Sequence, residues 1–283
     1  MCRVNQELST RNSELKYYLC IMTILDKIIA NKRIEVERAR AAVPVEELKK
    51  AEYYTRPTLS LKQRLLDEPG IIAEFKRKSP SKGEIHPGAS VEDIVSGYGL
   101  NGAAGISVLT DTDFFGGSRE DLLKARAASP VTPLLRKDFM IDEYQLHEAR
   151  AWGADVILLI AANLTPEEVL HLSRKARELN LEVLLEIHDR EELDRSPLDF
   201  VDIMGVNNRN LKNFAENNVN ASLELIEYLP DELVKISESC ISEPGTVKQL
   251  KAVGYQGFLM GENFMKTARP AVALHEFIKA VNG

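Results

Sequence analysis

Cysteine is scarce in this chain: Cys2, Cys20 and Cys240 are the three cysteines among its 283 residues. Their spacing fits neither a metal site nor a redox motif, so the sequence favours a reducing cytoplasm as the location of the protein. No cluster of His, Cys and Asp residues has the spacing of metal ligands, and the sequence therefore indicates no metal site.

Excess positive charge and long apolar runs are also missing. The chain has 43 acidic and 36 basic residues, and its net charge of −7 argues against nucleic-acid binding. Its apolar runs are too short to cross a membrane. Residues 1–21 lack a continuous apolar core followed by a small-residue cleavage site, so we expect no signal peptide. The composition, 44% hydrophobic and 28% charged, is that of an ordinary soluble globular protein.

The first 21 residues differ from the rest of the chain. A clear helix start comes only at Thr23, which can cap a helix together with Asp26 three positions later. We therefore predict that residues 1–21 form a poorly ordered or weakly docked extension, with an extra helix as the alternative. Residues 24–53 then read as one or two amphipathic helices that are broken near Pro44 and could cover one end of a barrel.

From residue 71 onward, short β-branched runs alternate with helical patterns. The runs are 71–75, 104–109, 132–136, 155–160, 182–187, 201–206, 233–237 and 257–260. The capping pairs before helices are Ser90 with Asp93, Ser118 with Asp121, Asp142 with Gln145, and Thr165 with Glu168. Strict alternation of eight strands with about eight helices predicts a parallel sheet, and near-continuous apolar strands predict that both of its faces are covered.

Two α/β folds fit this alternation. A doubly wound open sheet is the runner-up, but no Gly-x-Gly-x-x-Gly follows the first strand. Eight strand–helix units within one domain length favour a (β/α)8 TIM barrel. We therefore predict that residues 22–283 form a single barrel domain, which includes the helices at about 24–53.

The first predicted strand ends in two charged side chains. Glu74 and Lys76 lie two positions apart, so both point to the same face of the strand. A carboxylate and an ammonium on an otherwise apolar strand are costly unless they are paired or used. Pro80 and the Ser/Lys/Gly composition of residues 79–83 predict a mobile loop after the strand. A strand that frays into a solvated basic loop is the structural alternative.

Polar side chains end most of the other predicted strands, whereas the fourth strand ends in apolar residues. These polar residues are Thr110 and Asp111, Lys137 and Asp138, Glu186 and His188, Asn207, Glu238 and Ser239, and, after Gly261, Glu262 and Asn263. Because barrel enzymes carry their chemistry at the C-terminal ends of the strands, these side chains are predicted to converge. A neutral buried charge network is the alternative reading.

The last two strand ends predict a phosphate site. Ser239, Cys240, Gly261 and Glu262 follow strands seven and eight, where phosphate-binding barrels hold the anion. Residues 262–267 could form the short helix whose N-terminal N–H groups suit a dianion there. A plain turn at Gly261 is the alternative. The lack of a glycine after Ser239 weakens the prediction, because glycine lets a backbone approach a ligand closely.

Several long motifs, in order, resemble the indole-3-glycerol-phosphate synthase family of tryptophan biosynthesis from about Met22 to the C-terminus. They are residues 72–83 (IAEFKRKSPSKG), 107–111 (SVLTD), 115–118 (FGGS), 135–139 (LRKDF), 186–189 (EIHD), 205–211 (GVNNRNL), 237–239 (SES) and 258–262 (FLMGE). Two departures stand out. The family usually has glycine where this chain has Cys240, and the extension at 1–21 has no recognised counterpart.

The resemblance implies a lyase that closes the ring of 1-(2-carboxyphenylamino)-1-deoxyribulose 5-phosphate, releases carbon dioxide and loses water to give indole-3-glycerol phosphate. Lys137 would be the general acid, with its pKa lowered in a partly dry barrel mouth. Glu186, Glu74 and Lys76 would share the remaining proton transfers, and Asn207 would orient the substrate. These five residues are the predicted catalytic set.

The resemblance also implies a binding set around the anionic groups of the substrate. Lys76 would counter a negative charge, and the other members are Ser79, Arg209, Ser239, Cys240, Gly261 and Glu262. Arg209 would either contact an anion or brace the loop after the sixth strand. No cofactor or metal is implied, and the partners would be the phosphorylated substrate and, beyond it, other enzymes of the pathway. Two other functions stay open: a sugar-phosphate isomerase acting on the preceding intermediate, and a non-enzymatic barrel that binds a phosphorylated ligand or a pathway partner.

Overall fold

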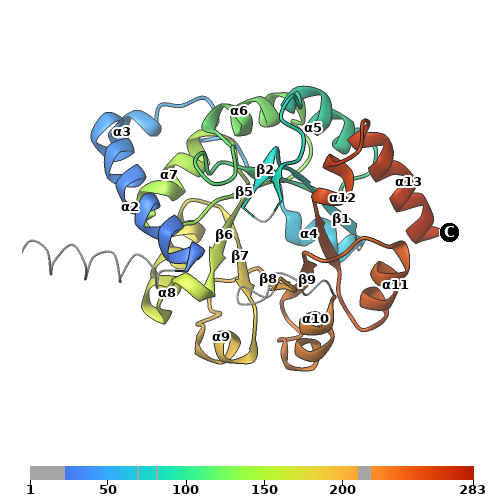
Figure 1. Ribbon diagram of the computed structural model, residues 1–283. Helices are drawn as coiled ribbons and strands as arrows, with labels where there is room; N and C mark the ends of the chain where they lie inside the picture. The colour runs from blue at the N-terminus through green and yellow to red at the C-terminus, as the bar shows by residue number, and fades with distance from the viewer. Residues whose placement is uncertain (1–22, 69, 81, 210–217) are drawn as a thin grey trace, which may run out of the picture.

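Parallel strands close into a barrel in a computed structural model that describes residues 23–68, 70–80, 82–209 and 218–283 (Figure 1). Within these ranges the eight barrel strands are β1 (Gly70–Phe75), β4 (Gly105–Leu109), β5 (Leu134–Lys137), β6 (Val156–Ile160), β7 (Glu182–Ile187), β8 (Ile203–Asn207), β9 (Val234–Glu238) and β10 (Gly257–Met260). Each predicted strand is present to within two residues at either end, so the predicted TIM barrel is confirmed. The predicted extension at residues 1–21 lies outside the described residues.

Helices surround the barrel, and most follow a strand (Figure 1). They are α2 (Ile24–Ala42), α3 (Val45–Leu48), α4 (Leu61–Asp67), α5 (Val91–Leu100), α6 (Arg119–Ala128), α7 (Glu143–Ala151), α8 (Pro166–Glu178), α9 (Arg190–Arg195), α10 (Asn220–Leu225), α11 (Pro244–Ala252), α12 (Glu262–Met265) and α13 (Pro270–Asn282), with 3-10 turns η1 (Ala161–Asn163) and η2 (Ile226–Tyr228). The capping pairs predicted at Ser90, Ser118, Asp142 and Thr165 all form. None of the helices in the described ranges is long and apolar enough to span a membrane.

Two apolar layers follow from the alternation of side chains along each strand. On β1, Ile72 points into the barrel and joins a cluster with Leu135, Leu184 and Ile236. Its neighbours on the same strand, such as Phe75, pack in the layer between the barrel and its helices. The barrel interior is therefore a packed core, and polar side chains can share it only at its ends.

Helix α4 fills the N-terminal end of the barrel. Its Leu61 and Leu65 are fully buried and belong to the inner cluster. Burial of each leucine stabilises the fold by about 1.5–3 kcal/mol. The carboxylate of Glu182, at the start of β7, accepts the Leu61 N–H at 2.8 Å and so helps to cap α4. With this end filled, the C-terminal end of the barrel is left for a ligand.

Helices α2 and α3 confirm the predicted helical segment before the first strand, and the break lies at Val43 and Pro44. Thr23 and Asp26 form the predicted capping box. The hydroxyl of Tyr144, on α7, donates to Val43 O at 2.8 Å and so ties the end of α2 to the barrel's outer layer.

The segment after β1 differs from the prediction. Residues 79–83 were expected to form a loop, but Lys78–Ser79 (β2) and Gly83–Glu84 (β3) pair as a two-stranded antiparallel sheet. Gly83 has φ +68°, a conformation that glycine adopts without strain.

Candidate active site

One layer of polar side chains lies at the C-terminal end of the barrel. Each member occupies the last inward-facing position of its strand, after the apolar residues of the inner cluster. The members are Glu74 on β1, Lys137 on β5, Glu186 on β7, Asn207 on β8 and Glu238 on β9. Because the strands are parallel, their carboxyl ends meet, and the layer is built by strand alternation alone.

Lys137 is at the centre of this layer. Its Nζ atom lies 2.8 Å from Glu186 Oε2 and 3.5 Å from Glu238 Oε2. Asn207 Nδ2 donates to the other oxygen of Glu186 at 3.1 Å. The Lys137 side chain is 16% exposed, whereas Glu186 and Glu238 are almost fully buried. The ammonium is therefore the member of this trio that a ligand can reach from solvent.

The charges of the layer set its protonation states. Burial disfavours the Lys137 ammonium, but the carboxylates of Glu186, Glu238 and Glu74 outweigh this effect and raise the pKa of Lys137. The expectation of a lowered pKa was therefore wrong, because it considered drying of the site without the acidic groups that the barrel brings around the lysine. Lys137 carries its proton at neutral pH.

The two carboxyl groups beside Lys137 are pushed in opposite directions. Burial alone would raise the pKa of Glu186, but Lys137 and His188 outweigh it and hold that pKa well below its usual range. Burial raises the pKa of Glu238, and the nearby charge of Glu186 adds to that effect, while Lys137 opposes it. Two neighbouring carboxyl groups with separated pKa values are the arrangement that acid–base chemistry requires.

Glu74 and Lys76 share a face of the chain, as their spacing predicted, and they form an ion pair. The Lys76 side chain is 17% exposed, and Glu74 is buried. Gly261, at the end of β10, makes room for the carboxylate: a Cβ atom there would lie 2.6 Å from Glu74 Oε1. The next residue, Arg77, turns away to α6, where it makes two hydrogen bonds to Asp121 at 2.7 and 2.9 Å. Of the basic residues after β1, Lys76 is thus the one that faces Glu74.

Glu238 is a site residue that the predicted catalytic set omitted. Its position at the end of β9 was noted, but the sequence did not show that it meets Lys137. A signal was present in Gly205, an isolated glycine in an apolar strand, which often marks a close approach. A Cβ atom on Gly205 would lie 2.2 Å from Glu238 Oε1.

His188, the residue directly after β7, adds a further titratable group beside Glu186. Its Nε2 atom is buried 3.6 Å from Glu186 Oε1, and its Nδ1 atom lies 3.1 Å from Glu192 Oε2. Burial lowers the pKa of the imidazole, but the hydrogen bond to Glu192 and the carboxylates of Glu186, Glu192 and Glu238 outweigh it, so that the pKa of His188 is raised.

The predicted phosphate-binding residues lie around the ends of β9 and β10. Ser239 and Cys240 have φ values of +64° and +59°, so the chain turns there through a conformation that side chains disfavour. Gly261 precedes α12, the short helix expected at 262–267. Lys82 Nζ lies 3.5 Å from a carboxylate oxygen of Glu262.

The other two predicted binding residues are Arg209, which follows β8, and Ser79, which belongs to the hairpin after β1. The Arg209 N–H donates to Asn207 Oδ1 at 3.0 Å, and its guanidinium opposes the rise that burial causes in the pKa of Cys240. Arg209 therefore lies close to the turn after β9. Ser79 is buried in the β2–β3 hairpin that follows β1. Contact of these residues with a phosphate stays a prediction.

Two aromatic rings stand beside the charged layer. Phe115 and Phe139 follow β4 and β5, and their ring centroids are 5.9 Å apart. Phe139 comes two residues after Lys137 and packs against the inner cluster. The mouth of the barrel therefore combines an apolar wall with acids, bases and cations. Among the described residues, no group of three or more His, Cys, Asp or Glu side chains could hold a metal ion.

Comparison with known proteins identifies close relatives. A family model described as indole-3-glycerol phosphate synthase matches residues 25–277. An indole-3-glycerol phosphate synthase of Bacteroides thetaiotaomicron is 48% identical over 259 residues, which cover 91% of this chain and 98% of the relative. One from Salinibacter ruber is 42% identical over 255 residues, which cover 89% of this chain and 94% of the relative.

Solved structures with the same fold are more distant in sequence. A 3-hexulose-6-phosphate synthase from Salmonella typhimurium aligns with a TM-score of 0.60 at 14% identity, covering 75% of this chain and 98% of that one. A thiamine phosphate pyrophosphorylase from Pyrococcus furiosus aligns with a TM-score of 0.57 at 14% identity, covering 79% of this chain and 98% of that one. At this identity the likeness supports the barrel fold alone.

Proposed function

The chain belongs to the indole-3-glycerol phosphate synthase family, and on that premise we propose how its residues convert 1-(2-carboxyphenylamino)-1-deoxyribulose 5-phosphate into indole-3-glycerol phosphate. The observation that carries the proposal is the 2.8 Å ion pair between Lys137 and Glu186 in the polar layer of the barrel. An ammonium and a carboxylate this close together support the proposal, because such a pair supplies an acid and a base to one substrate.

Ring closure needs a general acid. The ring carbon that bears the carboxylate attacks the ketone carbon, and the ketone oxygen gains negative charge as the new C–C bond forms. Lys137 donates a proton to that oxygen, because it is protonated at neutral pH and is the exposed member of its trio. The substrate must first loosen the ion pair with Glu186, since that pair holds the proton on the lysine.

The later steps need a base and a second acid. The bond between the ring carbon and its carboxylate then breaks. Carbon dioxide leaves, and the electron pair of that bond restores the aromatic ring. Loss of water then protonates the new hydroxyl as it departs and removes a proton from the methylene carbon between the amine nitrogen and the hydroxyl-bearing carbon, so that a C=C bond forms in the five-membered ring. Glu186 is ionised and suits the role of base, and the Glu74–Lys76 pair shares the proton transfer to the departing hydroxyl. Asn207 keeps Glu186 oriented through its 3.1 Å hydrogen bond.

The rest of the mouth suits the two ends of the substrate. Phe115 and Phe139 offer an apolar wall for the carboxyphenyl ring next to Lys137. Lys76 provides a partly exposed positive charge for an anionic group. On the opposite side, the phosphate would lie among the ends of β9 and β10. The residues proposed to bind it are Ser79, Arg209, Ser239, Cys240, Gly261 and Glu262.

A single assay tests this function. The purified protein is given the aminodeoxyribulose substrate, and carbon dioxide release is measured together with indole fluorescence. Equal amounts of both products are expected. A sugar-phosphate isomerase would retain the carboxylate of its substrate, and a non-enzymatic binder would leave the substrate unchanged, so the absence of carbon dioxide would refute the proposal.

Two wider parts of the proposal concern the cell. We place the protein in the cytoplasm, because its few cysteines show no disulfide or metal spacing and its family serves biosynthesis. We also propose that it contacts other enzymes of the tryptophan pathway, which would receive its product. Fractionation of cells tests the first part. Cross-linking in cells, followed by identification of the bound proteins, tests the second.

A further inference from the structure

Lys32, on helix α2, extends its side chain to the C-terminal end of the barrel, where β4 and β5 end. We propose that Lys32, on this helix before the first strand, is a positioning residue for catalysis: it holds together the two loops that carry Phe115 and Phe139. This inference rests on the proposed function, because the loops matter as walls of the substrate site. It gives α2 a part in the reaction, although α2 lies outside the repeated strand–helix units.

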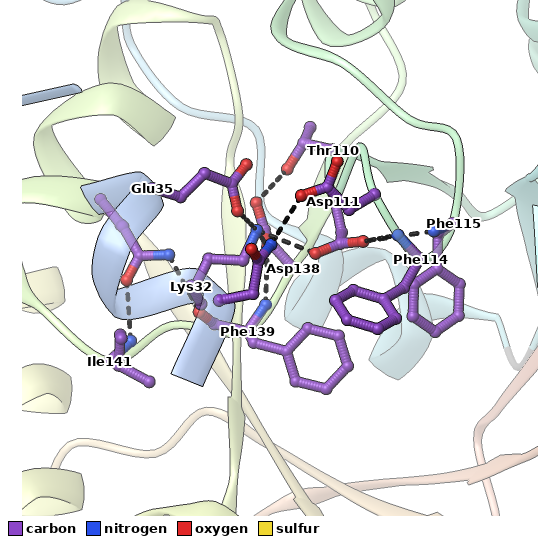
Figure 2. A network of polar contacts seen from close by, with 12 residues as sticks. Lys32, Glu35, Thr110, Asp111, Phe114, Phe115, Asp138, Phe139 and Ile141 are labelled. Atoms are coloured by element: carbon purple, nitrogen blue, oxygen red, sulfur yellow. Dashed lines mark hydrogen bonds and ion pairs between the residues drawn. The ribbon is translucent and has the colours of Figure 1, made fainter. Parts of the chain in front are cut away.

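The contacts of Lys32 are those of a buried tie between two loops. Its side chain is 3% exposed. Its ammonium lies 3.0 Å from Asp111 Oδ2 and 2.9 Å from Asp138 Oδ1, and Figure 2 shows it pointing between the two carboxylates. Glu35, one turn along the same helix, completes the set at 2.7 Å. Asp111 follows β4 and Asp138 follows β5, so a single ammonium bridges two strand ends.

Each of the two aspartates in turn fixes backbone that carries aromatic side chains. Asp111 Oδ1 accepts the N–H groups of Phe114 and Phe115 at 2.9 and 3.2 Å. Asp138 Oδ1 accepts the N–H of Phe139 at 2.8 Å (Figure 2). Lys32 thus reaches both members of the Phe115–Phe139 pair through one intervening carboxylate.

The electrostatics make this tie strong. Burial disfavours the Lys32 ammonium, but the carboxylates of Asp138 and Asp111 outweigh it and raise the pKa of Lys32. Burial would raise the pKa of Asp138, yet Lys32 and Arg136 outweigh it and hold that pKa far below its usual range. Both partners stay charged at neutral pH. Loss of the ammonium would leave buried carboxylates without their main counterion, which is strongly unfavourable.

Helix α2 is itself held in place, so that Lys32 acts from a fixed point. Asn31 Nδ2 donates to Asp113 Oδ2 at 2.7 Å, a second contact with the loop after β4. Ile28 and Val36, which lie four residues to either side of Lys32, are buried. A fixed helix that holds both loops reduces their freedom before the substrate arrives, which is how preorganisation aids catalysis.

The test compares Lys32→Met with Lys27→Met, which removes an exposed lysine from the same helix. At a temperature well below the melt, Lys32→Met should lower kcat about 10-fold or more, because small misplacements of catalytic groups are costly. It should also speed hydrogen exchange at the amides of Phe114, Phe115 and Phe139 about 10-fold, with no substrate present. The control variant should match the wild type in both measurements.

Two outcomes would overturn the proposal: unchanged exchange at those amides, or a loss of turnover that follows only the fraction of unfolded protein. The exchange measurement needs no turnover, so it tests the link between the two loops even if the wild-type protein failed to release carbon dioxide.

If Lys32→Met does not fold, a double variant that combines Lys32→Met with Asp111→Asn removes the uncompensated charge. Faster exchange at Phe139 in this double variant than in Asp111→Asn alone is then expected, and equal exchange would contradict the tie.

Discussion

Gly205 and Glu238 lie on neighbouring strands so close together that a Cβ atom on Gly205 would come within 2.2 Å of Glu238 Oε1. Leu184 Cδ1 would lie 3.0 Å from the same Cβ atom, so a methyl group at this position would be crowded by two side chains. The glycine therefore leaves the space in which the Glu238 carboxylate lies, with its Oε2 atom 3.5 Å from Lys137 Nζ. A backbone position without a side chain is thus part of the polar layer.

Gly205→Ala should disturb this arrangement with little change to the rest of the barrel. The added methyl group displaces the Glu238 carboxylate from Lys137, and we expect kcat to fall about 10-fold to 100-fold, the range for misplaced catalytic groups. Overpacking should also cost about 1–3 kcal/mol of stability. Steady-state kinetics and a thermal melt measure the two effects.

Gly257→Ala is the matched control for that variant. Gly257 begins β10 at the opposite end of the barrel, and a Cβ atom there would lie 2.4 Å from Ile236 Cγ2. It should lower stability by a similar amount and leave kcat unchanged. If Gly205→Ala kept full turnover, Glu238 would not need its observed position beside Lys137.

Lys137→Ala should lower kcat about 100-fold or more, the usual effect of losing a general acid. The control is Lys235→Ala. Lys235 lies near the N-terminal end of β9, away from the polar layer, and pairs with Asp231 at 2.7 Å. Turnover of the control should stay near the wild-type value. Near-native turnover of Lys137→Ala with a normal thermal melt would show that another group supplies the proton.

His188 should make stability depend on pH. Its folded-state pKa is raised above the ordinary value of 6.5. The stabilising contribution of the imidazolium is therefore present in full below about pH 6.5. This contribution is lost as the pH rises through the raised pKa. The difference in free energy of unfolding between wild type and His188→Asn should therefore be largest in acid and shrink toward alkaline pH. Urea unfolding at several pH values measures it.

His171→Asn serves as the control for that series. His171 is exposed on α8, where its Nε2 lies 3.6 Å from Glu143. This control shows what loss of an exposed histidine does in the same pH range. A His188→Asn difference that did not vary with pH, or that grew toward alkaline pH, would contradict the raised pKa.

The barrel and most of its polar layer could be predicted from the sequence because both depend on local patterns. Apolar runs of strand length, turn residues and caps specify each unit, and the polar residue at the end of a run, such as Lys137 or Glu186, marks the C-terminal edge. Parallel strands then bring these ends together without further information. Once the sheet is taken to close into a barrel, each strand pairs with its neighbours in the chain, and this sequential order is the one observed.

What could not be predicted depends on distant contacts. Lys32 has the sequence context of a solvated lysine on an amphipathic helix, and only the position of α2 on the barrel buries it. Glu238 meets Lys137 across strands whose register the sequence does not state. The sign of the pKa shift at Lys137 depends on how many carboxylates converge there, which is again a property of the closed barrel.

Cys240, in the turn after β9, occupies a position where the family usually has glycine. Its backbone conformation is strained for a residue with a side chain. Cys240 has φ +59°, and the left-handed conformation costs a residue with a side chain roughly 1–2 kcal/mol. Glycine would relieve this strain but would lose about 0.5–1 kcal/mol through the greater freedom of the unfolded chain. The net expectation for Cys240→Gly is a gain in stability of between about 0 and 1.5 kcal/mol.

Cys240→Gly should also act on the substrate's phosphate. A backbone without a side chain can approach the anion more closely, so we expect a modestly lower KM and an unchanged kcat, the pattern of a change in uniform binding. Cys240→Ala is the control, because it removes the thiol but keeps Cβ and its backbone strain; its KM should stay at the wild-type value and its melting temperature should not rise. Affinity for inorganic phosphate, measured alongside the melts, separates binding from stability. If both variants lost turnover while phosphate affinity stayed the same, the thiol, whose Sγ atom lies 3.9 Å from Asn208 O, would have a chemical role.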